Sequence, residues 1–148
     1  MTGPPPPVGY PEPALHESIS DIIRRHSTNR TDVRRAALEG IDLSRAHRLL
    51  DLGCGFGFMA RALAGRVPAG AAIIGVDSHP GNRLAFLASA AVGGGKGSYL
   101  CRTLVSHLDF PDRTFDLVIA SYSLYFFPAI IPEVARVLAP GGTLVAVT

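Results

Sequence analysis

Short apolar runs alternate with helix-like segments over the chain that follows Arg48. The runs that predict β-strands cover 49–52, 72–77, 98–105, 115–121 and 143–148, and the helix-like segments between them cover 58–67, 82–91 and 131–139. Strands that are apolar almost throughout are typical of a sheet covered by helices on both faces. With right-handed crossovers, this order predicts a doubly wound, Rossmann-like parallel α/β sheet. Glycine and proline are expected to stop the three helices, at Gly65, Gly93–Gly95 and Pro140–Gly142.

Two amphipathic helices are expected before this core. Apolar residues recur at three- and four-residue steps between positions 15 and 23, and a second helical pattern runs over Asp32–Leu43 with Thr31 as its N-cap. Six of the twelve prolines lie within the first 13 residues, which can bury almost nothing. We therefore expect a Pro-rich disordered tail over 1–13 and one domain over 14–148, with helices in 14–46 and the core in 47–148.

The charges of the chain are sparse and nearly balanced. With 14 basic and 12 acidic residues, a formal charge of +2 and 18% charged residues, neither nucleic acid nor an anionic membrane is the expected partner. Cys54 and Cys101 form no CxxC pair and lie near no histidine at metal-ligand spacing, so we expect no metal site and a reducing compartment. Without a signal-peptide run or a stretch of about 18 apolar residues, the expected location is cytoplasmic.

The sequence LLDLGCGFG joins a predicted buried strand to a helix through three alternating glycines, Gly53, Gly55 and Gly57. Glycines in this pattern accept positive φ and carry no Cβ, so a ligand can lie against main-chain atoms at the carboxyl end of the strand. Such a turn alone also occurs as a simple tight connection. It indicates a cofactor site only together with a second feature at the required spacing.

Asp77 supplies that second feature, because it ends the next strand 20 residues beyond Gly57. A carboxylate at this place can accept hydrogen bonds from both hydroxyls of a ribose. The alternative is that Asp77 only caps a helix that starts near Pro80, a role that Ser78 can also fill. Asp51 lies inside the first strand, where an ionised carboxylate without a partner costs several kcal/mol. It therefore needs a hydrogen-bond donor or a cation.

Two cofactors fit this pattern, a nicotinamide dinucleotide and S-adenosylmethionine. The stretch from Gly55 to Ala60 also has the GxGxxA spacing of dinucleotide-binding turns, so the glycines do not decide between them. A dinucleotide brings a pyrophosphate to the start of the helix, whereas S-adenosylmethionine brings a sulfonium and a zwitterionic methionine part. Asp51 fits the cationic ligand better.

Four successive motifs resemble those of class I S-adenosylmethionine-dependent methyltransferases, especially the small-molecule type. They are LLDLGCGFG, IIGVDSHPG, LDFPDRTFDLVIASYSLYFFP and PEVARVLAPGGTLV, and the resemblance covers the chain from Arg48 onward. It implies strand order 3-2-1-4-5, S-adenosylmethionine as cofactor, S-adenosylhomocysteine as product, and in-line methyl transfer to a small acceptor. The cofactor-binding residues that it implies are Gly53, Cys54, Gly55 and Gly57 at the methionine end, Asp77 at the ribose, Ser78 beside it, and Ser121 across the sheet opening.

Two departures from the family pattern bear on function. Where the family commonly has an Asp that binds the adenine amine, this chain has Leu104. Adenine is then expected to rest on Leu104 and on main-chain groups around Val105, which weakens purine discrimination by about 1 to 3 kcal/mol. The family fold also has two further strands after 143–148. We expect the exposed edge of that strand to be covered, by a missing C-terminal segment if the chain is a fragment, or else by a second copy or another protein.

No catalytic residue is assigned from the sequence. Methyl transfer from a sulfonium relies largely on positioning, and the titratable candidates have no recognisable partner. These candidates are His26, His79, His107, Tyr122 and Tyr125. Together with Phe126 and Phe127, the two tyrosines suit either an apolar acceptor wall or helix packing.

Three arginines ahead of the core, Arg30, Arg34 and Arg35, support a further hypothesis. The N-terminal helices would close over the crevice and these side chains would recognise an acidic substrate, although solvated helix surface is their commoner role. Two alternatives to an enzyme of this family stay open. One is a non-catalytic S-adenosylmethionine- or nucleotide-binding module, which the absent final strands favour, and the other is an oxidoreductase that uses NAD or NADP.

Overall fold

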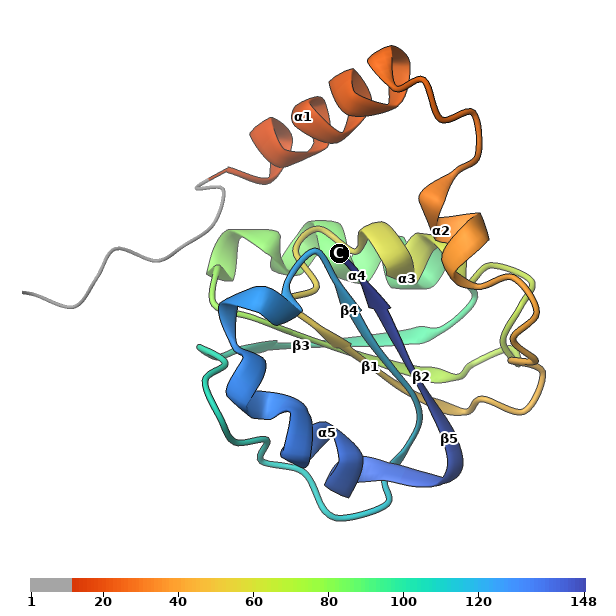
Figure 1. Cartoon of the computed structure of the whole chain (residues 1–148), viewed down its shortest axis with the longest axis vertical. Coiled ribbons are helices and arrows are strands. Elements are labelled where there is room, and N and C mark those ends of the chain that lie inside the picture. Colours follow the sequence, from red (N-terminus) through yellow and green to blue (C-terminus); the bar gives the residue numbers. More distant parts are fainter. Residues whose placement is uncertain (1–11) are drawn as a thin grey trace, which may run out of the picture.

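The computed structural model describes residues 12–148, so the predicted Pro-rich tail falls almost wholly outside the described residues. At its centre is a five-stranded sheet in the order β3-β2-β1-β4-β5 (Figure 1). The strands are β1 (Arg48–Leu52), β2 (Ala72–Asp77), β3 (Lys96–Cys101), β4 (Phe115–Ser121) and β5 (Leu138–Val147). All neighbouring strands pair in parallel. The predicted fold class and strand order are confirmed.

Helices cover both faces of the sheet. They are α1 (Pro13–His26), α2 (Val33–Ala37), α3 (Phe58–Ala62), α4 (Arg83–Val92) and α5 (Ile131–Val137), and Figure 1 shows α5 on the opposite side of the sheet from α3 and α4. Because successive side chains of a strand point to opposite faces, Leu49 of β1 packs in the cluster that includes α3 and α4, while Leu50 packs in the cluster that includes α5. The sheet is thus buried between two apolar layers.

The second N-terminal helix is shorter than the predicted span of Asp32–Leu43. α2 ends at Ala37, and Gly40 takes a φ of +74°, which turns the chain out of the helical direction. The side chain of Asp32 accepts a hydrogen bond from the Arg34 N–H at 2.9 Å and caps the helix. The prediction of Thr31 as the N-cap was therefore wrong.

The boundaries of β3 and β5 also differ from the predicted ones. β3 ends at Cys101, so Leu104 and Val105 lie in the loop that follows it. Pro140–Gly142 do not stop α5, which already ends at Val137. They lie inside β5, at a register shift against β4, with Gly141 at a φ of +79°. A bulge absorbs residues that would otherwise break the strand.

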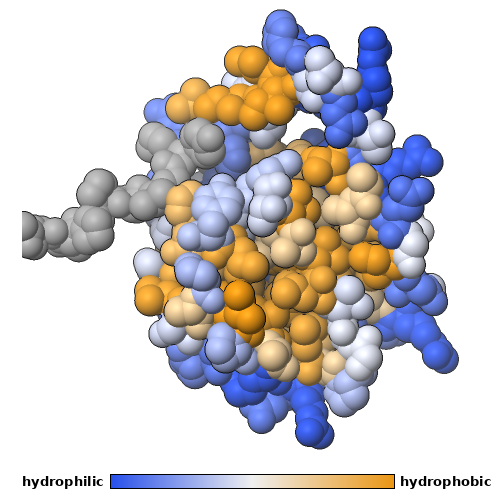
Figure 2. Space-filling view, viewed as in Figure 1, coloured by the Kyte–Doolittle hydropathy of each residue, from blue (hydrophilic) through white to orange (hydrophobic). Residues whose placement is uncertain are grey.

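α1 lies on the side of α3 and α4 and stands apart from the body of the fold (Figure 1). Three of its large apolar side chains, Leu15, Ile22 and Ile23, are exposed, and Figure 2 shows hydrophobic residues on α1 facing a broad hydrophobic area of the body across an open gap. Its first turns touch the body through His16, whose ring meets the Phe56 ring edge-on with centroids 4.9 Å apart. Among the helices of residues 12–148, none combines the length and apolar character needed to cross a membrane.

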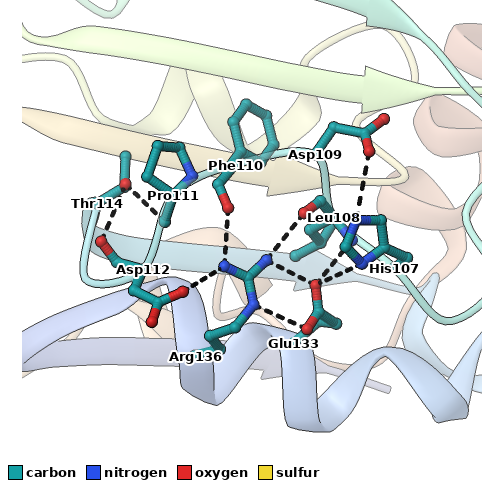
Figure 3. A network of polar contacts seen from close by, with 9 residues as sticks. All are labelled: His107, Leu108, Asp109, Phe110, Pro111, Asp112, Thr114, Glu133 and Arg136. Carbon is teal, nitrogen blue, oxygen red and sulfur yellow. Dashed lines mark hydrogen bonds and ion pairs between the residues drawn. The ribbon is translucent and has the colours of Figure 1, made fainter.

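Arg136 of α5 fixes the loop between β3 and β4 (Figure 3). Its guanidinium donates to both carboxylate oxygens of Glu133 at 2.8 and 2.7 Å, and to Asp112 at 2.6 Å. It also donates to the main-chain carbonyls of Phe110 at 2.8 Å and Leu108 at 2.9 Å. Within the part of the chain that the structure describes, the connection between β3 and β4 contains no helix that would pair its own carbonyl groups, and the Arg136 side chain pairs two of them instead.

Replacing Arg136 by Ala is expected to lower the melting temperature and to flatten its dependence on pH. Hydrogen bonds from Arg136, and then one from the Leu108 N–H, lower the pKa of Glu133 from 4.5 to about 2. A lowered carboxyl pKa contributes stability above the ordinary value, and that stability is lost as the pH falls toward 2. Circular-dichroism melting curves between pH 2 and 7 should show a shallower acid loss in the variant. Arg83→Ala, an exposed arginine at the start of α4, is the control, and identical curves for the two variants would contradict the assignment.

Candidate functional site

The carboxyl ends of three adjacent strands bring the main predicted cofactor residues together. In β1, Asp51 stands beside Gly75 of β2 and Ile119 of β4. Asp77 is the last residue of β2 and Ser121 the last residue of β4. The chain runs outward from β1 to β2 and β3 and then returns to β4 on the other side of β1. The carboxyl edge between β1 and β4 is therefore the topological switch point at which such sheets bind ligands.

The glycine turn lies directly above β1 and is held close to the sheet. The N–H groups of Gly53 and Cys54 donate to the Val76 carbonyl at 2.8 and 3.2 Å. Gly53 has a φ of +66°, and a Cβ there would lie 2.5 Å from the Ser123 Cβ. Gly57 has a φ of +88° and is the N-cap of α3. Both glycines are therefore required by conformation and by space, which leaves main-chain atoms facing the site.

Asp77 ties the end of β2 to this turn. One carboxylate oxygen accepts the Gly55 N–H and the other accepts the His79 N–H, each at 2.9 Å. The short helix that starts at Pro80 has His79 as its N-cap and no side-chain cap, so Asp77 does not cap it. The hydrogen bond from the His79 N–H fixes the turn that follows β2. It does not exclude ribose binding, because each carboxylate oxygen can accept a second hydrogen bond. Ser78 lies half-buried beside it, and its carbonyl accepts the Cys101 thiol at 3.5 Å.

The carboxyl group of Asp51 is buried and forms no ion pair within residues 12–148. Only 3% of the residue is exposed, and its Oδ2 has no hydrogen-bond partner. Burial, and then the charge of Asp77, raise the pKa of Asp51 to about 7. Cys54 lies next to these groups, and burial raises the pKa of its thiol well above the usual value, so it stays neutral. The site therefore holds two carboxylates, and no lysine or arginine within residues 12–148 forms an ion pair with either.

Three buried polar side-chain atoms of the described residues lack a hydrogen-bond partner, and all three lie at this edge. They are Asp51 Oδ2, Ser121 Oγ and His79 Nδ1. Buried polar groups are almost always paired in folded proteins, so unpaired ones gathered at one place indicate a ligand that pairs them. A carboxylate, a hydroxyl and an imidazole nitrogen suit a ligand with ammonium and hydroxyl donors.

Sequence reasoning missed His16 and Ser123, which lie on two sides of the turn. His16 Cε1 is 3.2 Å from the position of a Cβ on Gly55, and burial lowers the pKa of its imidazole while the charge of Asp77 opposes this. The Ser123 hydroxyl donates to the Leu52 carbonyl at 2.6 Å. His16 has no sequence signal, because α1 reaches the turn only through the tertiary fold. Ser123 has no spacing signal of its own either. The serine, however, lies within the recognised fourth-strand motif.

The segment after β4 presents aromatic side chains next to the turn. Tyr122, with a φ of +52°, separates Ser121 from Ser123 and is about half exposed. Tyr125 and Phe126 follow in a 3₁₀ turn, also half exposed, with ring centroids 4.5 Å apart. Residues 117–132 contain no charged side chain. This aromatic segment can contact an apolar ligand beside the cofactor site.

The other residues singled out in the sequence lie elsewhere or stay untested. His107 lies in the β3–β4 loop, with its ring nitrogens 3.0 Å from Glu133 and 3.4 Å from Asp109 (Figure 3). His26 is exposed at the end of α1. Leu104 packs against the core cluster on the α5 side, and Val105 is exposed. The roles of these last two toward adenine stay a prediction.

The fold and the site define a Rossmann-like domain with a glycine turn and an acidic edge, and comparison with known proteins identifies its family. A family model described as "Methyltransferase domain" matches residues 50–146. The chain therefore belongs to the methyltransferase family, and S-adenosylmethionine is the cofactor that this membership implies. The predicted resemblance is confirmed.

Individual relatives agree with this family. The chain is 32% identical to a trans-aconitate 2-methyltransferase of Variovorax paradoxus, over 83% of this chain and 46% of the relative. It is 35% identical to a demethylmenaquinone methyltransferase of Lactiplantibacillus plantarum, over 76% and 49%. The crystal structure of an S-adenosylmethionine-dependent methyltransferase from Mesorhizobium loti matches with a TM-score of 0.53 at 25% identity, over 76% of this chain and 50% of that one. The chain spans about half the length of these relatives.

Proposed function

We propose that this chain binds S-adenosylmethionine at the glycine turn and supports transfer of its methyl group to a small acceptor that lies against the aromatic segment. When bound, the cofactor supplies an electrophilic methyl group on a good leaving group, so that positioning provides much of the rate. The residues of this chain then hold the donor, seat the acceptor and exclude water. Their arrangement supports each of these roles.

The observation that carries the proposal is the buried, unpaired carboxylate of Asp51 beside Asp77. A dinucleotide would bring a negatively charged pyrophosphate to a site that already holds two carboxylates, which is unfavourable. The ammonium of S-adenosylmethionine would pair with Asp51, and its ribose hydroxyls would find free lone pairs on Asp77. Ser121 and the turn, with Cys54, would contact the methionine part.

The acceptor side supports a small ligand with an apolar face. The aromatic segment offers Tyr122, Tyr125 and Phe126 and carries no charge of its own. Contacts with aromatic faces favour flat or apolar parts of a molecule. The matched relatives are named for two different acceptors, trans-aconitate and demethylmenaquinone, so family membership alone assigns no acceptor here.

A second candidate function is a binding module without turnover. The residues that would hold the methionine part and the ribose lie within the sheet edge and turn described above, whereas no catalytic residue is assigned. Such a module would bind S-adenosylmethionine and S-adenosylhomocysteine but would transfer no methyl group across a broad acceptor panel. Methyl transfer to any member of the panel would exclude it.

Asp77→Ala is expected to weaken S-adenosylmethionine binding at least tenfold, or about 1.4 kcal/mol, because the ribose loses its hydrogen-bond acceptor. Isothermal titration calorimetry with S-adenosylmethionine, S-adenosylhomocysteine, NAD and NADP measures the effect and the cofactor choice together. Heat from the dinucleotides alone would contradict the proposed function.

The control for this experiment is Asp109→Ala, an aspartate that is 80% exposed on its side chain and lies in the loop before β4. It should leave cofactor binding unchanged. Because Asp77 also accepts the Gly55 N–H, melting curves of both variants are needed to confirm that the protein binds from a folded state. An unchanged dissociation constant for Asp77→Ala would contradict the ribose role.

A further inference from the structure

A cavity on the outer side of α3 gathers positive charge. Its volume is about 340 Å³, and its lining is Asp32, Arg34, Arg35, Arg61, Ala62 and Arg66. Residues of α2 and its N-cap supply one wall, and the end of α3 with the turn that follows supplies the other. Figure 1 shows α2 next to α3. Since α3 starts at the glycine turn and runs away from it, its last residues lie toward the opposite edge of the sheet. We call this the arginine cavity.

The charge of the arginine cavity exceeds that of the whole protein. Four arginines and one aspartate give it a formal charge of +3, whereas the chain carries +2, so that all other residues together carry −1. Like charges confined to a concave surface repel one another and focus a positive potential. If these arginines served only to make the surface soluble, we would expect them to be distributed over the fold rather than gathered around one cavity.

Two of the four arginines are fixed in place. Arg34 donates through Nε and Nη2 to the carboxylate of Asp32, and its guanidinium lies 4.8 Å from the centre of the Phe58 ring. Arg66 donates to the Leu38 carbonyl at 3.1 Å. These contacts remove much of the rotamer freedom that makes an exposed arginine a weak binder.

The other two arginines are open for a ligand. Arg35 and Arg61 are exposed, and within residues 12–148 neither forms an ion pair. Their guanidiniums keep all five N–H donors available in the fork geometry that matches carboxylate and phosphate oxygens. Two ordered and two open guanidiniums thus surround one cavity.

We propose that the arginine cavity binds a small polyanion that carries two or three carboxylate or phosphate groups. A volume of about 340 Å³ equals roughly eleven waters at about 30 Å³ each, which suits a molecule of the size of citrate or pyrophosphate. A nucleic acid is disfavoured, because the rest of the chain carries a net negative charge and offers no extended basic stripe. The site goes beyond the proposed function and needs no S-adenosylmethionine.

The arginine cavity is connected to the cofactor turn through one aromatic side chain. Phe58, against which Arg34 packs, directly follows Gly57, and its ring lies 6.3 Å from that of Phe56. The His16 ring also contacts Phe56, edge-on with centroids 4.9 Å apart. A bound anion that holds Arg34 would therefore also restrain the position of α3 at the turn.

The test is calorimetry of the full chain at low ionic strength, with citrate in one arm and pyrophosphate in the other, and with no S-adenosylmethionine present. We expect 1:1 binding of at least one anion, and the responding arm identifies carboxylate or phosphate as the preferred group. Arg61→Ala and Arg35→Ala should each weaken binding at least fivefold. Arg61→Lys, which keeps the charge but loses the fork, should fall between Arg61→Ala and the wild type.

Arg83→Ala is the matched control, since Arg83 is an exposed arginine outside the arginine cavity. No binding of either anion at millimolar concentration, or equal weakening by Arg61→Ala and Arg83→Ala, would overturn the proposal. The proposal would also be overturned if a single-stranded oligonucleotide bound more tightly than either anion and Arg61→Ala and Arg35→Ala abolished that binding. The arginines would then form a nucleic-acid surface. Circular-dichroism melting of each variant verifies that binding is compared between folded proteins.

Discussion

Asp51→Asn is expected to weaken S-adenosylmethionine binding by about a hundredfold while it stabilises the unliganded protein at pH 8. The loss of binding follows from removing a buried charge that has no partner until a cation arrives. Truncating one member of a buried charge pair costs about 2 to 5 kcal/mol, and a hundredfold change corresponds to about 2.7 kcal/mol. Calorimetry at pH 8, where the carboxyl group of the wild type is mostly ionised, measures this part.

The stabilisation by Asp51→Asn has a defined dependence on pH. Burial, followed by the charge of Asp77, raises the pKa of Asp51 to about 7, so the folded state prefers the protonated acid. A raised carboxyl pKa contributes stability below the ordinary value near 4, and that contribution is lost as the pH rises through about 7. Asparagine cannot ionise and does not suffer this loss. The gain of the variant over the wild type should thus be about 2 to 3 kcal/mol larger at pH 8 than at pH 5.

Urea denaturation of the unliganded proteins at both pH values measures the stability difference. Asp109→Asn, an exposed aspartate, should show neither the loss of binding nor the gain of stability. A stability difference between Asp51→Asn and wild type that is the same at pH 5 and pH 8 would show that Asp51 is not held as a buried acid. The binding result would then need another explanation.

The strands were predictable because their apolar pattern is nearly continuous, whereas their order was implied by the resemblance to class I methyltransferases. The predicted spans 72–77 and 115–121 coincide with β2 and β4, which are central strands buried on both faces. β3 is an edge strand with alternating exposure, so the apolar run 98–105 misplaced it toward its C-terminal side. Gly95, just before β3, is closely packed, since a Cβ there would lie 2.3 Å from the Ile73 side chain.

Part of the site was also predictable, for a chemical reason. Glycines at alternate positions and an aspartate at the end of the next strand are local signals, and both sit at the carboxyl edge as expected. His16 could not be found in this way, because its contact with Phe56 joins α1 to a turn 40 residues further along the chain and depends on the tertiary fold. The burial of Asp51 was anticipated from its strand, but its missing partner was not visible without the tertiary structure.

Gly57→Ala is expected to destabilise the protein by about 2 to 4 kcal/mol and to weaken S-adenosylmethionine binding with it. Gly57 has a φ of +88°, which costs an alanine about 1 kcal/mol. A Cβ there would also lie 2.6 Å from the Ser89 Cβ and 3.3 Å from the Phe86 Cα. Ser89 cannot easily give way, because its hydroxyl donates to the Phe56 carbonyl at 2.9 Å. Overpacking of this kind costs a further amount of about 1 to 3 kcal/mol.

Gly65→Ala separates conformational strain from overpacking, because Gly65 has a similar φ of +70° but no atom within 4 Å of an added Cβ. It should cost about 1 kcal/mol and leave cofactor binding unchanged. Urea denaturation and calorimetry of both variants give the comparison. Equal destabilisation by the two substitutions would mean that α4 yields to the new methyl group, and that the turn is not held against Ser89 as described. A larger effect at Gly57 would show that α4 packing sets the shape of the main-chain surface on which the cofactor is proposed to lie.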